Sequence, residues 1–283
     1  MQNELSPERA RQVLDMLTAG GAMDGINTSL ALRLLPLASE LGDTSLMDRL
    51  MNHATTVAED DTERGWARFE GLKMIEASLQ QFISLVEEVE THEKGEPLAA
   101  ALHHHIALIQ LAEGSLDVAH ATATRALRLR EKIGDLRGMS YGYAVLIAVA
   151  KRRHDIDTAI ALGTERLELL NKLKDHVGQM EAVADLAHSQ ATIGEFGAAN
   201  DLFQDSLQRA QELGSLSGQL VARWGLADLA EIREDFESAM LVLSDCLHAY
   251  MAEDIPGPVQ VKQRIEALTN LQNTPKEQDE GSQ

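Results

Sequence analysis

The chain of 283 residues contains one cysteine, six prolines and few aromatic side chains, which make up 4% of it. A single cysteine, Cys246, excludes an intrachain disulfide. Few prolines leave few helix breakers, and no long segment alternates apolar and polar residues with the period of two that a sheet requires. Because strong helix formers such as alanine, leucine, glutamate and arginine dominate the rest, we expect an all-α protein.

Positive charge is also scarce, with 25 Lys and Arg against 45 Asp and Glu and a net charge of −20. Nucleic acids and anionic membranes attract cationic surfaces, so we expect no nucleic-acid partner. No run approaches the ~18 apolar residues of a membrane span. The first residues, MQNELSPERA, lack the apolar core of a signal peptide. We therefore expect a cytoplasmic protein without membrane insertion.

Internal repetition is the strongest pattern, and its period is 40 residues. Three columns keep their character over four units: Ala119, Ala159, Ala199 and Ala239; Leu127, Leu167, Leu207 and Leu247; Leu116, Ile156, Phe196 and Phe236. Each unit is predicted to be a pair of helices. In the third unit they run over about 179–193 and 196–213, with a turn at Gly194. We expect the recurring alanine to allow close helix packing and the recurring leucine to lie on the core face.

The motif that carries a family resemblance is clearest in the third unit. Leu186-Ala187, Gly194, Phe196 and Ala199 follow the order of conserved positions in the tetratricopeptide repeat, and the chain resembles that family over about residues 98–255. The 40-residue unit is similar to the longer repeats of kinesin light chains and bacterial peptide-sensing regulators. His154 and Glu234 stand where the turn glycine is expected. The resemblance implies a right-handed α-solenoid of antiparallel helix pairs, a superhelix whose first helices line a concave groove.

The pattern divides the chain into four parts. Residues 1–97 are predicted to form an N-terminal cap helix, with Ser6 as its N-cap, and diverged helix pairs; 98–255 hold the regular repeats; 256–273 form a capping helix; 274–283 form a disordered tail. Pro36 is expected to break or kink its helix. Asp155 is expected to cap the helix that follows it.

The family resemblance also places the groove positions in the first helix of each pair. The partner-binding candidates that follow are His104, His105, Tyr141, Lys151, Arg152, Glu181, Asp185, His188, Trp224, Asp228 and Glu231. Spacings of three and four residues keep the last six on one face of each helix. The Lys/Asn/Arg set that binds a terminal carboxylate in some family members is absent, so a clamp of that kind is not expected.

Two motifs suggest other chemistry. The run His103-His104-His105 resembles a metal site, but neighbouring helical residues point about 100° apart and cannot converge on one ion. Gly138-Met139-Ser140-Tyr141-Gly142 matches the G-x-S-x-G of hydrolases, which requires a strand-to-helix turn, whereas a helix is predicted here. We therefore expect no metal, no cofactor and no catalytic residue. We do expect His104 and His105 to titrate near pH 6.5 and to shift partner binding between pH 6 and 8.

Charge is unevenly distributed. Residues 125–153 contain eight basic and two acidic side chains, and residues 181–254 contain fourteen acidic and three basic ones. A partner with parts of both signs would be oriented by this arrangement. Our leading hypothesis is a non-enzymatic scaffold or adaptor that binds a peptide or helix of a partner protein in its concave groove. The alternatives are a peptide-sensing regulatory protein that changes conformation on ligand binding, and a self-assembling scaffold that forms homo-oligomers.

Overall fold

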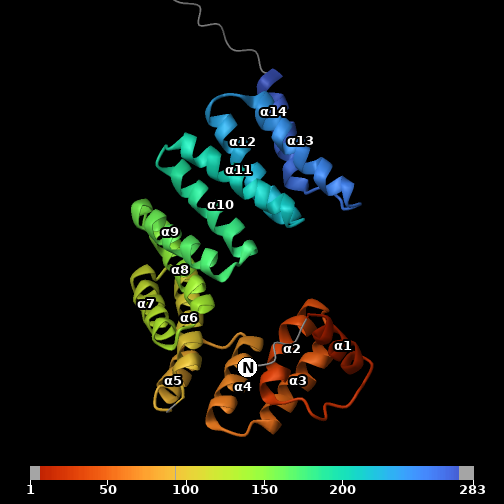
Figure 1. The fold of residues 1–283 in the computed structure, drawn as a ribbon, viewed down its shortest axis with the longest axis vertical. Helices are drawn as coiled ribbons and strands as arrows, with labels where there is room; N and C mark the ends of the chain where they lie inside the picture. Colours follow the sequence, from red (N-terminus) through yellow and green to blue (C-terminus); the bar gives the residue numbers. More distant parts are fainter. Residues whose placement is uncertain (1–6, 93, 274–283) are drawn as a thin grey trace, which may run out of the picture. The chain divides into compact units, whose positions relative to one another are not determined.

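A computed structural model describes residues 7–92 and 94–273. Within these ranges the chain forms fourteen helices and no strand (Figure 1). It divides into two compact units, Met1–Asp135 and Leu136–Gln283. The expected N-cap Ser6 and the expected disordered tail 274–283 lie outside the described residues.

The first unit contains seven helices. They are α1 (Pro7–Thr18), α2 (Thr28–Glu40), α3 (Thr44–Val57), α4 (Asp61–Met74), α5 (Leu79–Val89), α6 (Glu96–Ala112) and α7 (Leu116–Ile133). One core cluster joins α1, α2 and α3, where Leu17, Leu46 and Leu50 are fully buried. A second joins α4, α5 and α6 around Phe82 and Leu102. Each cluster buries the apolar stripe of amphipathic helices, which stabilises helices too short to persist alone.

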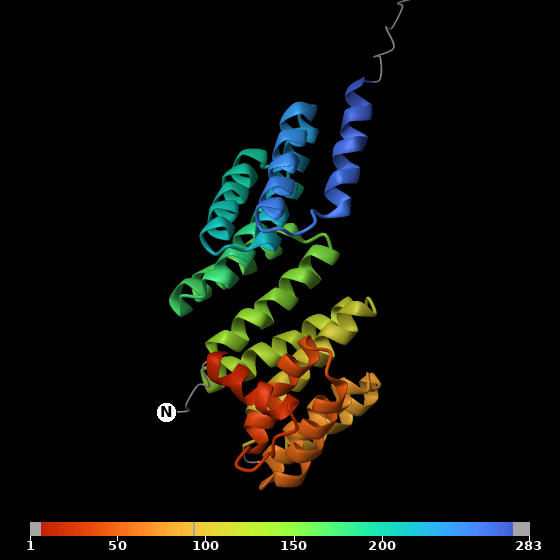
Figure 2. The same ribbon diagram turned by 90° about the vertical axis from the view of Figure 1, so that its right-hand side faces the viewer.

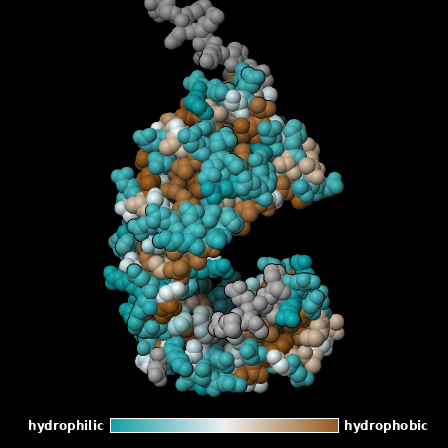
Figure 3. All heavy atoms as spheres, viewed as in Figure 1, coloured by the Kyte–Doolittle hydropathy of each residue, from teal (hydrophilic) through white to brown (hydrophobic). Residues whose placement is uncertain are grey.

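The second unit contains the remaining seven. They are α8 (Leu136–Arg152), α9 (Ile156–Leu173), α10 (His176–Thr192), α11 (Phe196–Glu212), α12 (Leu216–Ile232), α13 (Phe236–Ala252) and α14 (Val259–Asn273). The helices from α8 to α13 pack in consecutive pairs, α8 with α9, α10 with α11 and α12 with α13, and α14 packs against α13 (Figure 2). On the face of this unit visible in Figure 3, hydrophobic residues lie in bands between hydrophilic ones. The apolar stripes of the helices are therefore directed toward their neighbours.

The 40-residue columns explain the packing within each pair. The recurring alanines are 0–1% exposed, because the first helix of the pair passes directly over them. The apolar column begins the second helices at Leu116, Ile156, Phe196 and Phe236, as predicted. The recurring leucines, Leu127 and its three equivalents, are half-buried. Leu207 and Leu247 pack against core clusters, which agrees with their predicted place on the core face. Phe203 and Leu243, from a neighbouring column, are the large side chains that fill the interior.

The turns inside the pairs require a left-handed backbone conformation. Gly194 has φ +83°, which glycine adopts without a steric penalty. His154 and Glu234, which replace the turn glycine in other units, have φ +59° and +58°. A residue with a Cβ atom is strained there by about 1 kcal/mol. Asp155 follows the first of these turns and accepts a hydrogen bond from the Thr158 amide at 3.2 Å, so its predicted capping role is confirmed.

Pro36 does not break its helix, and that part of the prediction is wrong. Helix α2 continues from Thr28 to Glu40 with Pro36 inside it. Proline removes one hydrogen bond and crowds the preceding turn. The apolar residues on both sides of it, Leu34, Leu35 and Ala38, are buried in the first core cluster and hold the helix together. In the described ranges, no helix has the length and apolar character needed to cross a membrane.

Candidate protein-binding groove

The first helices of the pairs in the second unit border two cavities. One has a volume of 460 Å³ and is lined mainly by α10 and the start of α12. The other, of 420 Å³, lies among α10, α12 and the segment that begins α14. His188 and Val221 line both cavities, so the two adjoin; together they are named here the α10/α12 groove. Its volume lies in the range of sites that accept side chains or small ligands.

Carboxylates border the first cavity, and cations of the same chain already bind them. Asp185 accepts a hydrogen bond from Lys151 Nζ at 3.3 Å and another from Arg166 Nη1 at 3.3 Å. Glu181 lies 3.8 Å from Arg166 Nη2. The structure therefore brings together three predicted site residues, but it couples them to each other and to Arg166. Their charges are partly neutralised before any partner arrives.

The prediction of site residues missed Arg166, which lies on α9 and is 7% exposed. Its Nε atom is buried without a hydrogen-bond partner in the described structure. One signal in the sequence could have identified it. The equivalent positions in the other units hold Ala126, Ser206 and Cys246, which are small and buried. An arginine in a column of small buried residues indicates a buried charge that needs carboxylates nearby.

A cation from the last helix lies against Trp224, which lines the second cavity. The Arg264 guanidinium of α14 lies 4.4 Å from the centre of the Trp224 ring. It donates from Nε to Glu231 at 2.8 Å and from Nη2 to Asp228. Cation–π contact and two carboxylates together bind α14 to α12. Arg264 lies outside the regular repeats, so no column of the sequence predicts this contact.

Two residues give the α10/α12 groove an uncharged middle. The His188 ring packs edge-on against Phe203, with centroids 4.8 Å apart. Burial, and then the nearby Lys151 charge, lower the pKa of His188, although Asp228 and Asp185 oppose them. The imidazole is therefore neutral at neutral pH. Val221, which the prediction also missed, is apolar and 45% exposed. Leu220, Trp224 and Val261 line the second cavity beside Val221, so its exposed surface is part of an apolar patch.

His104 and His105 belong to the first unit and take part in its packing. His105 contacts the Phe82 ring edge-on, with centroids 4.6 Å apart. The Nδ1 atom of His104 lies 3.5 Å from Nη1 of Arg130. Burial, and then the Arg130 charge, lower the pKa of His104 to about 4. Burial and the Lys73 charge also lower the pKa of His105. The expectation that His104 titrates near pH 6.5 is therefore wrong.

The remaining candidates, Tyr141 and Arg152, are both exposed on α8. Neither residue lines one of the two cavities described above. Four of the predicted residues line the α10/α12 groove: Glu181, Asp185, His188 and Trp224. Lys151, Asp228 and Glu231 do not line it but are bound within the chain, Lys151 to Asp185 and the two carboxylates to Arg264.

The hydrolase motif has a different geometry from a nucleophile elbow. Ser140 lies within α8, is 2% exposed and donates a hydrogen bond to the Arg137 carbonyl at 2.7 Å. A nucleophile at the tip of a strand-to-helix turn is exposed to substrate. Across residues 7–92 and 94–273, no group of three or more His, Cys, Asp or Glu side chains is placed to hold a metal ion. His103 instead contacts Glu90, with Nε2 at 2.8 Å from Oε1.

Comparisons with known proteins relate the chain to others by structure alone. No protein-family model matches it, and no curated protein matches it in sequence. A signal transduction ATPase (STAND) protein with a tetratricopeptide repeat sensor from Pyrococcus horikoshii is similar with a TM-score of 0.63 and 14% identity. That match covers 94% of this chain and 39% of the other. This chain therefore spans well under half of the STAND protein.

Two further solved structures match over nearly their whole length. BtubC (BKLC) from P. vanneervenii has a TM-score of 0.55 and 14% identity, covering 90% of this chain and 95% of the other. The apo form of RapI has a TM-score of 0.57 and 10% identity, covering 86% and 96%. Together with the helix pairs described above, these likenesses establish the fold class. The chain has the tetratricopeptide-type fold, an α-solenoid of consecutive helix pairs.

Proposed function

We propose that the protein is a non-enzymatic adaptor that binds a peptide segment or helix of another protein in the α10/α12 groove. The observation that carries the proposal is the pair of adjoining cavities around Val221 and His188. The apolar surface of Val221 and Trp224 stays accessible between helices that are otherwise packed. A partner side chain that fills either cavity would remove this surface from water.

The ion pairs change the expected recognition chemistry. Lys151 and Arg166 bind Asp185, and Arg264 binds Asp228, so these charges hold neighbouring helices together. A partner that paired with them would first displace an existing cation or carboxylate. Apolar anchors of the partner therefore supply most of the affinity, and the bordering charges select among partners.

A substitution at Val221 tests the proposal without disturbing the core. Val221→Asp places a carboxylate between the two cavities, where partner binding would desolvate it. We expect a loss of about 2 kcal/mol, or roughly 30-fold in affinity, from lost apolar contact and desolvation. The measurement is the affinity of peptides selected from a random displayed library against the unmodified full chain. Circular dichroism at each step verifies that the helical content is unchanged.

The same unit offers a matched control. Leu241 on α13 is 63% exposed and does not line the groove. Leu241→Asp introduces the same charge on an exposed apolar residue of a second helix. The proposal expects the selected peptides to bind this variant as they bind the unmodified chain. Equal loss in both variants would assign the effect to charge alone, and undiminished binding to Val221→Asp would refute the groove.

A further inference from the structure

The second helices of the regular repeats share an exposed stripe. In α7 it contains residues 125, 128 and 132, which recur every 40 residues at the same positions of α9, α11 and α13. All but one of these twelve side chains are exposed, and the exception, Asp205, is partly exposed. Because the three equivalents of the α7 stripe face solvent within the second unit, the stripe is an outer surface of the repeat and not a packing face.

Helix α7 differs from its equivalents in the charge of this stripe. It presents Arg125, Arg128 and Lys132. The stripes of α9, α11 and α13 contain Glu165, Glu168 and Lys172; Asp205, Gln208 and Glu212; and Asp245, His248 and Ala252. Of these four helices, α7 alone is cationic at all three positions. In a chain of net charge −20 this is a local reversal of sign.

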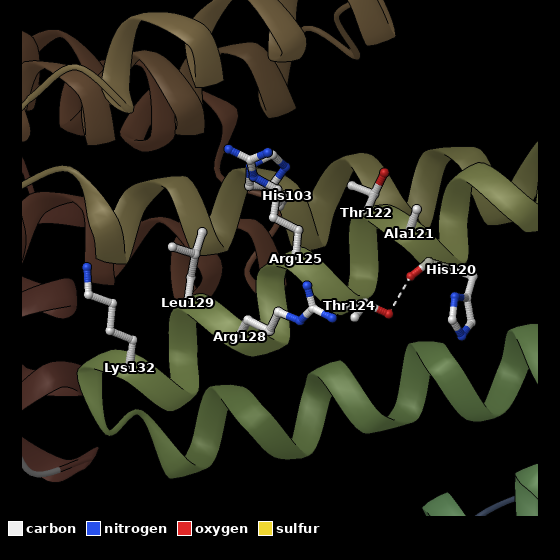
Figure 4. A pocket seen from close by; sticks show the side chains of 9 residues that line it. All are labelled: His103, His120, Ala121, Thr122, Thr124, Arg125, Arg128, Leu129 and Lys132. Atoms are coloured by element: carbon white, nitrogen blue, oxygen red, sulfur yellow. Dashed lines mark hydrogen bonds between the residues drawn. The ribbon is translucent and has the colours of Figure 1, made fainter.

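The cationic stripe borders a hollow in the first unit. The hollow has a volume of 890 Å³, and its nine lining residues include the three cations, His103 and His120 but no carboxylate (Figure 4). Leu129 provides an apolar part of the wall. In Figure 4 Arg125 extends toward His103, while Arg128 and Lys132 extend from the same helix. Cationic donors spaced along one helix beside an apolar side chain favour a ligand with several carboxylates.

The cations are available to a ligand. Arg125 Nη2 binds Glu90 at 2.7 Å, but its side chain is 59% exposed. Lys132 binds Glu96 and is 66% exposed. Exposed pairs of this kind contribute about 0–1 kcal/mol and exchange readily. Within the described ranges, Arg128 has no hydrogen-bond or ion-pair partner, and it lies between the two paired cations.

We propose that this stripe is a second docking surface, which binds an acidic segment of a partner protein. The positions from 125 to 132 extend about 10 Å along the helix, the length of three to four residues of an extended chain. Three cations suffice for such a segment. A nucleic acid is disfavoured, since its many phosphates would meet the surrounding negative charge of the protein. The surface shares no lining residue with the α10/α12 groove.

The test uses a fluorescein-labelled peptide with four consecutive glutamates between glycine-serine flanks, titrated with the full chain at 50 mM NaCl. Anisotropy should show saturable binding that weakens in 500 mM NaCl. Lys132→Glu should weaken binding about fivefold, and Arg128→Glu about tenfold. Lys172→Glu is the matched control, because it makes the same charge change at the equivalent position of α9. The proposal expects binding to this control within about twofold of the unmodified chain.

Several outcomes would overturn the proposal. They include equal weakening in the α7 variants and in Lys172→Glu, and binding of a four-lysine peptide as tightly as the acidic one. If a 20-nucleotide single-stranded DNA binds more tightly than the acidic peptide, and Arg128→Glu abolishes that binding, the occupant is a nucleic acid instead. If the chain self-associates in sedimentation velocity and Arg128→Glu abolishes that association, the occupant is a second copy of this chain.

Discussion

The buried guanidinium of Arg166 makes a quantitative prediction about Asp185. The Arg166 side chain is 8% exposed, and its shortest ion pair is the 3.3 Å contact with Asp185. Asp185→Ala removes that partner and leaves the charge buried with Glu181 at 3.8 Å. Breaking a fully buried pair from one side costs about 3–5 kcal/mol. Since the Asp185 side chain is 44% exposed, we expect a smaller loss, about 2 kcal/mol.

The reverse substitution should behave differently. Arg166→Met keeps an apolar stem in the same space and removes a guanidinium whose Nε has no partner. Asp185 retains its hydrogen bonds from Lys151. We expect Arg166→Met to change the free energy of unfolding by less than about 1 kcal/mol, because a buried ion pair often contributes little relative to an apolar replacement. The double variant should resemble Arg166→Met, which gives a coupling energy of about 2 kcal/mol between the two sites.

Thermal unfolding followed by circular dichroism measures this cycle in the full chain. A loss of 2 kcal/mol corresponds to a lower melting temperature by about 4–8 °C for a unit of this size. Glu181→Ala is the control, because its contact is longer and Glu181 is 57% exposed; we expect less than about 0.5 kcal/mol. An Asp185→Ala variant with the same melting temperature as the unmodified protein would refute this prediction. Additive losses in the double variant would refute it as well.

Three further predictions concern turns, pH and packing. His154→Gly and Glu234→Gly should each raise the free energy of unfolding by about 0.5–1 kcal/mol in urea titrations, because both positions have positive φ; a lower midpoint would contradict this. The pKa of His104 is lowered to about 4 in the folded chain, so the unfolded chain binds its proton first as pH falls. The stability that neutral His104 contributes is present above pH 6.5 and is lost as the pH falls toward 4. The free energy of unfolding of His104→Gln, relative to that of the unmodified protein, should therefore rise by about 1 kcal/mol between pH 7.5 and pH 5.5. A constant difference would refute that account. Gly225→Ala places a Cβ 2.2 Å from the Phe203 ring, and calorimetry should show a loss of about 1–3 kcal/mol, whereas an unchanged melting temperature would show that the ring moves freely.

The fold was largely predictable because each 40-residue unit repeats the same requirements for packing a helix pair. Ala119 and its equivalents must be small for the helices to approach, and the positions around Gly194 must turn. These are local requirements, and each is visible in a single column. The sequence did not predict that the recurring leucines are only half-buried, because one helical face does not reveal where the next pair will cover it.

The site was less predictable, because its chemistry depends on pairs of residues far apart in the sequence. The position of Trp224 in its repeat predicted its place beside the α10/α12 groove, but not the Arg264 guanidinium above its ring. Arg166 and Asp185 are on different helices of neighbouring pairs, and their contact follows from the packing angle. Charges predicted to bind a partner therefore proved to be bound within the chain. Val221, an ordinary apolar residue that no sequence motif distinguishes, proved to be the exposed side chain shared by the two cavities of the α10/α12 groove.

Site-specific photo-crosslinking can show whether a protein segment binds between α10 and α12. Benzoylphenylalanine replaces Val221 in one full-length variant and Leu241 in another, and each is irradiated with a peptide selected on the unmodified chain. If the segment binds there, position 221 forms a covalent adduct that excess unlabelled peptide suppresses, and position 241 forms none. Adducts of equal yield from both positions, or an adduct from position 241 alone, would contradict binding between α10 and α12.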